Sequence, residues 1–296
     1  MKVFLTGATG FIGSAIVPEL IGAGHHVLGL TRSNAGAELL QNLGAQPFLG
    51  DVHDLKRICV GAAQCEAVMH LAFNHDFDRY VASCEEDRHI IEALGSVLEH
   101  SDRPLIVTSS TSVVDEKSGH PATEEDAPLS SKLAARAASE EAAAEVAAWG
   151  AKVMVVRLSQ IHDATRSGKA VNSAIQAARE AGVSAYVGAD GTKCLPAAHR
   201  LDTARLYRLI LEKGVAGARY HAVAEEGITY LEIAETIGQH LNLPVRPITQ
   251  GEAHEHFGWL SAFTGWNFRA SSAKTRQQLG WQPTGPGLIA DLRNLQ

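Results

Sequence analysis

The sequence has 296 residues, 45% hydrophobic and 20% charged, which excludes a disordered chain and predicts one large domain or two lobes. Its 26 Lys and Arg residues against 33 Asp and Glu give a formal charge of −7, so no attraction to a nucleic-acid backbone is expected. No run of about 18 apolar residues is present, and we therefore expect a cytoplasmic protein with no membrane partner.

The first half of the chain alternates short apolar segments with amphipathic ones. Lys2–Thr6 predicts a buried strand, and the apolar spacing along Ile12–Leu20 predicts a helix directly after it. Further strands are expected at His26–Leu30, Gln46–Leu49, Ala67–Leu71, Leu105–Thr108 and Lys152–Leu158, with helices at Ala35–Leu43 (capped by Asn34), near Glu85–Glu99 and from about Ser131 to Trp149. Apolar strands between helices are typical of α/β proteins with a doubly wound parallel sheet, the Rossmann architecture.

After residue 160 the alternation loosens. Helices are expected at Lys169–Ala181, Thr203–Lys213 and Tyr230–Leu241, and strands at Tyr220–Ala224 and Val245–Ile248. We therefore expect a nucleotide-binding domain over 1–160, whose sheet is re-entered near 219–226, and a smaller α/β substrate-binding lobe over most of 161–296.

A glycine-rich loop lies between the first strand and the first helix. It reads Thr6-Gly7-Ala8-Thr9-Gly10-Phe11-Ile12-Gly13, with glycines at the first, fourth and seventh positions after the strand. Gly7 permits a tight turn, Gly10 lets the backbone approach a pyrophosphate, and Gly13 lets helix and strand pack closely. The loop with Thr9, Phe11 and Ile12 is therefore the predicted cradle for a dinucleotide at a helix N-terminus.

With this loop the sequence resembles the extended short-chain dehydrogenase/reductases, the NAD-dependent epimerase/dehydratase superfamily. Further matching segments are Gly50-Asp51-Val52, His70-Leu71-Ala72, Thr108-Ser109-Ser110-Thr111, Val156-Arg157-Leu158, His199-Arg200-Leu201-Asp202 and Leu279-Gly280-Trp281-Gln282-Pro283. The resemblance implies a bound nicotinamide nucleotide, with Asp51 and Val52 against adenine. It places Leu71, Ala72, Phe73, Ser109 and Leu158 beside the cofactor.

The end of the second strand decides between the two nicotinamide nucleotides. It reads Leu30-Thr31-Arg32-Ser33, where an NAD site usually places a carboxylate for the ribose 2′-hydroxyl. A guanidinium and a hydroxyl instead suit a 2′-phosphate, so Arg32 and Ser33 predict NADP(H). The alternative is that Arg32 is an ordinary solvated cation.

The family's catalytic set is only partly matched. Its members use a Tyr followed four residues later by a Lys, with a Ser or Thr that orients the substrate carbonyl. Ser110 matches the hydroxyl, but no tyrosine lies between Tyr80 and Tyr186. The resemblance therefore implies an atypical member that lacks the catalytic Tyr.

Two alignments of the alanine-rich helix remain open. In one, Lys132 is the ribose-binding lysine and the tyrosine position falls near Pro128. In the other, Glu140 matches the family's glutamate, so Lys132 takes the tyrosine position and Arg136 the lysine position. Both alignments place Lys132 at the cofactor, where it would be the proton donor. Lys132 and Arg136 are four residues apart and would share a helix face. The alternative is that they are ordinary solvated charges.

Three other residues are candidates to face a substrate. His75 follows the fourth strand, and Tyr186 and His199 fall in segments that family members use to line the substrate cleft, although each is also a common structural residue. No metal is expected, since His254 and His256 lack a third ligand and the four cysteines form no CxxC pair.

These features favour an NADP(H)-dependent oxidoreductase that reduces a small or medium carbonyl, enone or imine compound by hydride transfer. A non-catalytic NADP-binding redox sensor is the alternative from another class, favoured by the missing phenol. A sugar epimerase or dehydratase that retains NAD is opposed by the same missing Tyr and by Arg32. The partner expected is a small-molecule substrate, and the resemblance also admits a homodimer.

Overall fold

The computed structural model describes residues 1–115, 119–165 and 169–294. Its centre is a seven-stranded sheet in which every neighbouring pair is parallel, in the order β10-β6-β5-β4-β1-β2-β3. The strands are β1 (Lys2–Thr6), β2 (His26–Thr31), β3 (Gln46–Leu49), β4 (Ala67–His70), β5 (Pro104–Ser110), β6 (Lys152–Leu158) and β10 (Arg219–Ala222). This confirms the predicted doubly wound α/β sheet.

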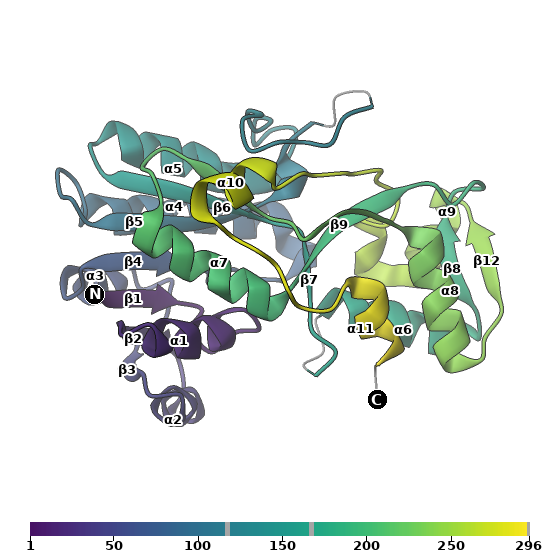
Figure 1. Cartoon of the computed structure of the whole chain (residues 1–296), viewed down its shortest axis with the longest axis horizontal. Coiled ribbons are helices and arrows are strands. Elements are labelled where there is room, and N and C mark those ends of the chain that lie inside the picture. The colour runs from purple at the N-terminus through teal and green to yellow at the C-terminus, as the bar shows by residue number, and fades with distance from the viewer. Residues whose placement is uncertain (116–118, 166–168, 295–296) are drawn as a thin grey trace.

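Helices cover both faces of the sheet because alternate strand residues point to opposite sides. Val3 and Leu5 pack into the core under α1 and α7, whereas Phe4 packs into the core under α3, α4 and α5 (Figure 1). The helices of this lobe are α1 (Gly13–Gly22), α2 (Asn34–Asn42), α3 (Leu55–Ala63), α4 (Tyr80–Ser96), α5 (Ala138–Ala148), α7 (Arg200–Lys213) and α10 (Ala273–Leu279).

Two sequence predictions about helix starts are wrong. The alanine-rich helix α5 begins at Ala138 and not near Ser131, because Ala134 is extended and the backbone N–H of Ser131 is held by the Glu141 carboxylate at 2.8 Å. Residues 135–137 form a 3₁₀ turn before it. Helix α2 is capped by Ser33 and not by Asn34, since the Ser33 side chain accepts a hydrogen bond from the Gly36 N–H at 3.1 Å.

A second lobe lies beside the carboxyl ends of the sheet strands (Figure 1). Strands β7 (Gln160–His162), β9 (Cys194–His199) and β11 (Glu225–Thr229) form one small sheet, and β8 (Ser184–Val187) and β12 (Val245–Ile248) form another. Its helices are α6 (Lys169–Ala181), α8 (Tyr230–Leu241), α9 (Gln250–Phe257) and α11 (Leu288–Arg293).

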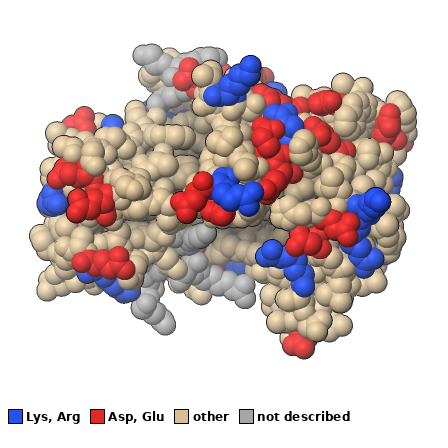
Figure 2. Space-filling model, turned by 180° about the vertical axis from the view of Figure 1, so that it is seen from behind, with Lys and Arg blue, Asp and Glu red and all other residues tan. Residues whose placement is uncertain are grey.

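The surface carries charges of both signs. On the face seen in Figure 2, acidic and basic side chains are interspersed and form no continuous basic field. Within the described part of the chain, no helix combines the length and the apolar character needed to cross a membrane.

Candidate active site

The strand order creates a crevice at the carboxyl edge of the sheet. In the sheet, β1 lies between β4 and β2. After β1 the chain continues to β2 on one side, and after β4 it continues to β5 on the other side. Ligands of open α/β sheets bind at such a switch point. The glycine loop after β1 lies at this point and ends at the N-terminus of α1.

The glycines of this loop are required by its geometry. Gly7 has a φ of +69°, and a Cβ there would lie 2.8 Å from the Ala72 nitrogen. A Cβ on Gly13 would lie 2.1 Å from the Gly7 carbonyl oxygen. Gly10 donates its N–H to the Gly7 carbonyl at 2.9 Å and is itself exposed, so its backbone is open to a ligand. The loop therefore fits a dinucleotide pyrophosphate, as its spacing predicts.

Arg200 holds this loop from the start of α7. Its guanidinium donates to the Phe11 carbonyl at 3.0 Å and to the Ser14 hydroxyl at 3.3 Å. It also pairs with Asp163 at 2.7 Å, in the segment after β7. This buried ion pair joins the glycine loop to the second lobe.

Arg32 and Asp51 lie near each other at the ends of β2 and β3. The Arg32 side chain is 76% exposed, and its nearest carboxylate oxygen, on Asp51, is 4.0 Å away. The backbone N–H of His53 is the main cause that holds the pKa of Asp51 below its ordinary value, with its ring at 2.8 Å a further one. Val52, which follows Asp51 in the sequence, is half-buried. The guanidinium of Arg32 is thus available to a ligand.

The ends of β4, β5 and β6 bring the other predicted cofactor residues to the same edge. The N–H groups of Leu71 and Ala72 both donate to the Thr6 hydroxyl at 3.2 Å. Ser110 pairs with Leu158 across β5 and β6 and is half-buried, and its hydroxyl lies 2.8 Å from that of Ser112. Ser109 is buried and donates to Glu140 at 3.0 Å, so its side chain is committed to the interior.

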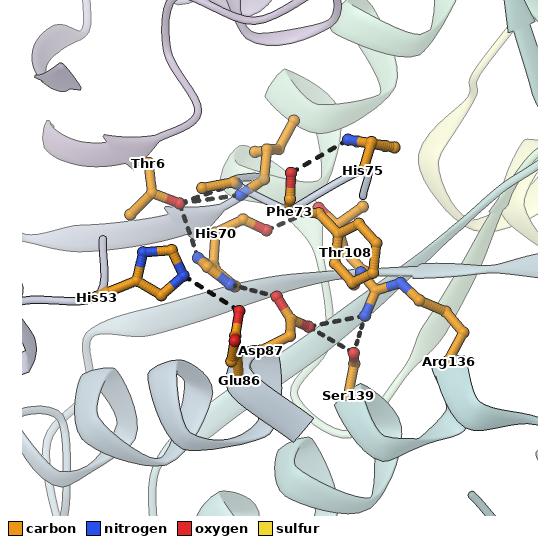
Figure 3. A network of polar contacts seen from close by, with 12 residues as sticks. Thr6, His53, His70, Phe73, His75, Glu86, Asp87, Thr108, Arg136 and Ser139 are labelled. Atoms are coloured by element: carbon orange, nitrogen blue, oxygen red, sulfur yellow. Dashed lines mark hydrogen bonds and ion pairs between the residues drawn. The ribbon is translucent and has the colours of Figure 1, made fainter. Parts of the chain in front are cut away.

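A buried network of polar side chains lies at the ends of β1, β4 and β5 (Figure 3). Because the Thr6 hydroxyl accepts the two N–H groups above, its own hydrogen points to His70 Nδ1 at 2.7 Å. His70 Nε2 then donates to Asp87 Oδ1 at 2.9 Å. Asp87 Oδ2 accepts from Arg136 at 2.7 Å and from Ser139 at 2.5 Å. The network therefore runs from the glycine loop to the start of α5.

Arg136 is fixed in this network. Its guanidinium also donates to Ser139 and to the Thr108 carbonyl, the latter at 2.8 Å, and it lies over the Phe73 ring at 4.3 Å from the centroid. Burial alone would raise the pKa of Asp87, but the charge of Arg136 and the hydrogen bonds from His70 and Ser139 lower it below its ordinary value. Asp87 is consequently an anion at neutral pH.

Two further titratable groups lie beside this guanidinium. Burial raises the pKa of Tyr80 to about 12 and that of Cys84 to about 11. Tyr80 begins α4, and its ring packs against Phe73 with 6.2 Å between centroids. Both groups are therefore neutral near pH 7.

Helix α5 is tied to the central sheet through Glu140. Its carboxylate accepts two hydrogen bonds from the fully buried Arg157, at 2.7 and 2.9 Å. The expectation that Lys132 and Arg136 share a helix face is wrong, since Lys132 lies in the turn before the 3₁₀ segment. Lys132 is exposed there and has no ion pair with another described residue.

The three predicted substrate residues lie in different surroundings. His75 is exposed beside Phe73, with its Nδ1 3.1 Å from the Phe73 carbonyl oxygen. Tyr186 lines an apolar cavity in the second lobe. His199 is buried and caps α7 by accepting the Leu201 N–H at 3.3 Å, so its ring is held in the interior of the protein.

The sequence interpretation missed the network of His70, Asp87 and Ser139, and the role of Arg200. The motif segments contain His70 and Arg200, and this was the available signal. Asp87 and Ser139 carry no local signal because they meet only through the packing of α4 on α5. The full arrangement offers a pyrophosphate cradle, an open cation at the end of β2, and a hydroxyl at Ser110 where the three strands end.

Most of this chain matches a family of known proteins. A model of the NAD dependent epimerase/dehydratase family matches residues 3–224. An uncharacterised protein of Schizosaccharomyces pombe is 44% identical over 296 residues, which cover 99% of this chain and 98% of that protein. Cinnamoyl-CoA reductase 1 of Oryza sativa subsp. japonica is 35% identical over 121 residues, which are 38% of this chain and 35% of that enzyme.

A solved structure shares the fold. The dTDP-glucose 4,6-dehydratase DesIV from Streptomyces venezuelae, with NAD and TYD bound, superposes with a TM-score of 0.79 at 20% identity. The match covers 99% of this chain and 96% of that one. At this identity the likeness concerns the fold alone.

Proposed function

The chain belongs to the NAD-dependent epimerase/dehydratase family, and on this premise we propose that it is an NADP(H)-dependent oxidoreductase. It would reduce a small or medium carbonyl, enone or imine compound by hydride transfer. The observation that carries the choice of nucleotide is the open guanidinium of Arg32 at the end of β2, 4.0 Å from the nearest carboxylate oxygen.

The neighbours of Arg32 fit a 2′-phosphate. An exposed ion pair as long as that of Arg32 with Asp51 contributes little, so the guanidinium can turn to a ligand at small cost. Ser33 accepts the Gly36 N–H through its oxygen and keeps its hydroxyl hydrogen for a phosphate oxygen. His53 orients Asp51 through its N–H and its ring, and Asp51 would face the adenosine part of the nucleotide.

The cofactor and two side chains would each have a separate part in the reduction. Bound NADPH would supply the hydride. Ser110 would donate a hydrogen bond to the substrate oxygen, since its hydroxyl lies half-buried at the end of β5. Lys132 would deliver the proton, because its ammonium can release one whereas the guanidinium of Arg136 stays charged and is tied to Asp87. The name of the partly matching reductase from rice agrees with this direction of reaction.

The nucleotide assignment is tested by calorimetric titration of nucleotide-free protein with NADPH and NADH. We expect NADPH to bind at least about tenfold more tightly, about 1.4 kcal/mol, and Arg32→Ala to remove the difference. Arg246→Ala is the matched control, since Arg246 is also exposed with one long carboxylate contact, at 3.6 Å. Equal binding of both nucleotides by the wild-type protein would overturn the assignment.

The fixed position of Arg136 favours one other candidate, a non-catalytic NADP sensor. A sensor needs no catalytic group at the family's lysine position. Arg136 can therefore stay bound to Asp87 and the Thr108 carbonyl without loss of that function. Turnover separates the two functions. The reductase requires NADPH oxidation in a screen of carbonyl and enone compounds, and Lys132→Met should lower kcat at least tenfold while NADPH affinity is retained. Unchanged turnover in this variant would remove Lys132 from the chemistry.

A further inference from the structure

The second lobe contains a cavity whose walls are almost entirely apolar. It lies between α6, β8, α8 and the 3₁₀ segment Gly258–Ala262, and it has a volume of about 100 Å³. Ala174, Ile233 and Leu260 are typical of its lining. A dry apolar cavity of about 150 Å³ takes up benzene in an engineered protein, so this volume suits a slightly smaller hydrocarbon group.

The polar side chains in the cavity wall are mostly bonded to the protein itself. The Tyr230 hydroxyl donates to the Phe263 carbonyl at 2.8 Å, and the Ser184 hydroxyl donates to the Ala234 carbonyl at 2.8 Å. No charged side chain is among the described residues of the lining. A diphosphate or a sugar would lose its hydration there without compensation. An uncharged apolar group loses nothing and gains from leaving water.

The cavity adjoins the proposed site of hydride transfer. Gln160 of its wall follows Leu158, the cofactor-side end of β6, by two residues. Phe263 of its wall packs against Phe77 and Tyr80, with centroid separations of 5.5 and 6.1 Å. Tyr80 in turn packs against Phe73, which places a continuous set of aromatic rings between the cavity and the network around Arg136.

We propose that this cavity binds an uncharged hydrocarbon group of the substrate, either a short alkyl chain or a single ring, and thereby selects apolar carbonyl compounds. This assignment of substrate class rests on the proposed reductase function. The reacting carbonyl lies at the mouth beside Ser110 and Leu158, and the hydrocarbon group extends past Gln160 between α6 and α8. The other polar groups of the wall are the hydroxyl of Tyr186 at β8, the amide of Gln160 and the hydroxyl of Thr264.

Binding of product analogues tests the proposal without turnover. The protein saturated with NADP⁺ is titrated with propanol, butanol, pentanol and hexanol, and tryptophan fluorescence is followed, since Trp259 stacks on Phe77 at 4.1 Å. We expect each added methylene to tighten binding about fourfold until the cavity is filled. Affinity that does not depend on chain length, or tight binding of UDP-glucose, would overturn the proposal.

Substitutions on two helices locate the bound group. Ala174→Phe fills the cavity from α6 and should abolish the dependence on chain length. Ala181→Phe, on the exposed end of the same helix, should preserve it. Ile233→Ala enlarges the cavity from α8 and should extend the gain to a longer alcohol, so the proposal does not depend on one variant that fills the core. An unchanged series in Ala174→Phe would place the alcohol elsewhere.

The outcome is separable from that of the proposed function. The same alcohol series titrated without nucleotide tests the cavity alone, because its lining includes none of the residues of the glycine loop. Chain-length dependence without NADPH oxidation would retain the apolar ligand site and reject the reductase. NADPH-dependent reduction of carbonyl compounds with no preference for apolar groups would do the opposite.

Discussion

At the scale of single residues, Asp87 is the charge on which the buried network depends. Its side chain is 2% exposed and bonds to His70, Arg136 and Ser139 from one carboxylate. Removal of one partner from such a cluster leaves an uncompensated charge, whereas replacement of both partners by uncharged groups is far less costly. Burial of these charges costs free energy, and only the complete set of hydrogen bonds in the network offsets that cost. The same bonds fix the position of Arg136.

Asp87→Asn should destabilise the protein by roughly 3–5 kcal/mol, because it leaves the Arg136 guanidinium buried without its anion. The double variant Asp87→Asn/Arg136→Met should recover most of this loss. Urea unfolding at pH 7 measures both free energies of unfolding. If the double variant is no more stable than the single one, the buried charge is not the cause.

At the scale of helices and strands, the start of α2 combines a structural and a proposed binding role in one residue. Ser33 is extended, with a φ of −133° and a ψ of 157°, which places its oxygen on the Gly36 N–H. The same residue precedes a helix N-terminus, where the dipole favours an anion such as a 2′-phosphate. Asn34 is an equally suitable residue type for the cap but is already helical.

Substitutions at Ser33 separate these two roles. Ser33→Ala should lower the free energy of unfolding by about 1 kcal/mol, whereas Ser33→Gly should lower it by only a few tenths. Both variants should reduce the preference for NADPH over NADH, since both lack the hydroxyl. Thermal unfolding and calorimetric titration of the two variants measure these effects. A preference that falls only with alanine would show that the cap, and not the hydroxyl, governs nucleotide choice.

At the scale of the whole molecule, segments far apart in sequence meet at the edge strand β10. His221 of this strand donates its Nδ1–H to the Ser271 carbonyl at 2.8 Å, and its backbone N–H to Thr275 at 2.9 Å. Thr275 donates to the buried Glu124 through both its N–H and its hydroxyl. Burial lowers the pKa of His221 to about 4, so the native state holds this ring neutral.

The neutral His221 ring should therefore make the fold weaker as pH falls below about 6.5. An unfolded histidine has a pKa of about 6.5, so between about pH 6.5 and 4 the unfolded state binds a proton that the native state does not. The free energy of unfolding should fall by roughly 3 kcal/mol across this window as pH is lowered. His221→Asn keeps a donor for Ser271 and should reduce the loss, as urea unfolding at pH 7 and 4.5 will show. An equal loss in the variant would assign the acid sensitivity to other groups.

The fold was readable from the sequence wherever a signal is local. Lys2–Thr6 and Lys152–Leu158 were predicted with the same bounds that the structure has, because a continuous apolar run between turns describes a doubly covered parallel strand. The start of α5 was not readable. Its residues Lys132 to Ala135 are good helix formers, and the long-range bond between Glu141 and Ser131 overrides that local preference.

The candidate site shows the same division. The glycine loop and Arg32 were selected from the sequence because the signal for each lies in adjacent residues, and their binding roles stay predictions. The bond between Asp87 and Arg136 joins residues 49 apart, and no periodicity reports it. Gly285 likewise lies so close to His199 that an added Cβ would be 2.7 Å from its side chain, and no local pattern indicates this approach.

The late position of β10 also affects how the protein is made. The core that contains Val3 and Leu5 also contains Leu279 and Trp281, and β10 covers the outer edge of β6 only after residue 222 is available. On the ribosome, the lobe that contains the central sheet thus cannot be completed as soon as the first 160 residues emerge. Until β10 has left the exit tunnel, β6 remains an open edge that can pair with other nascent strands.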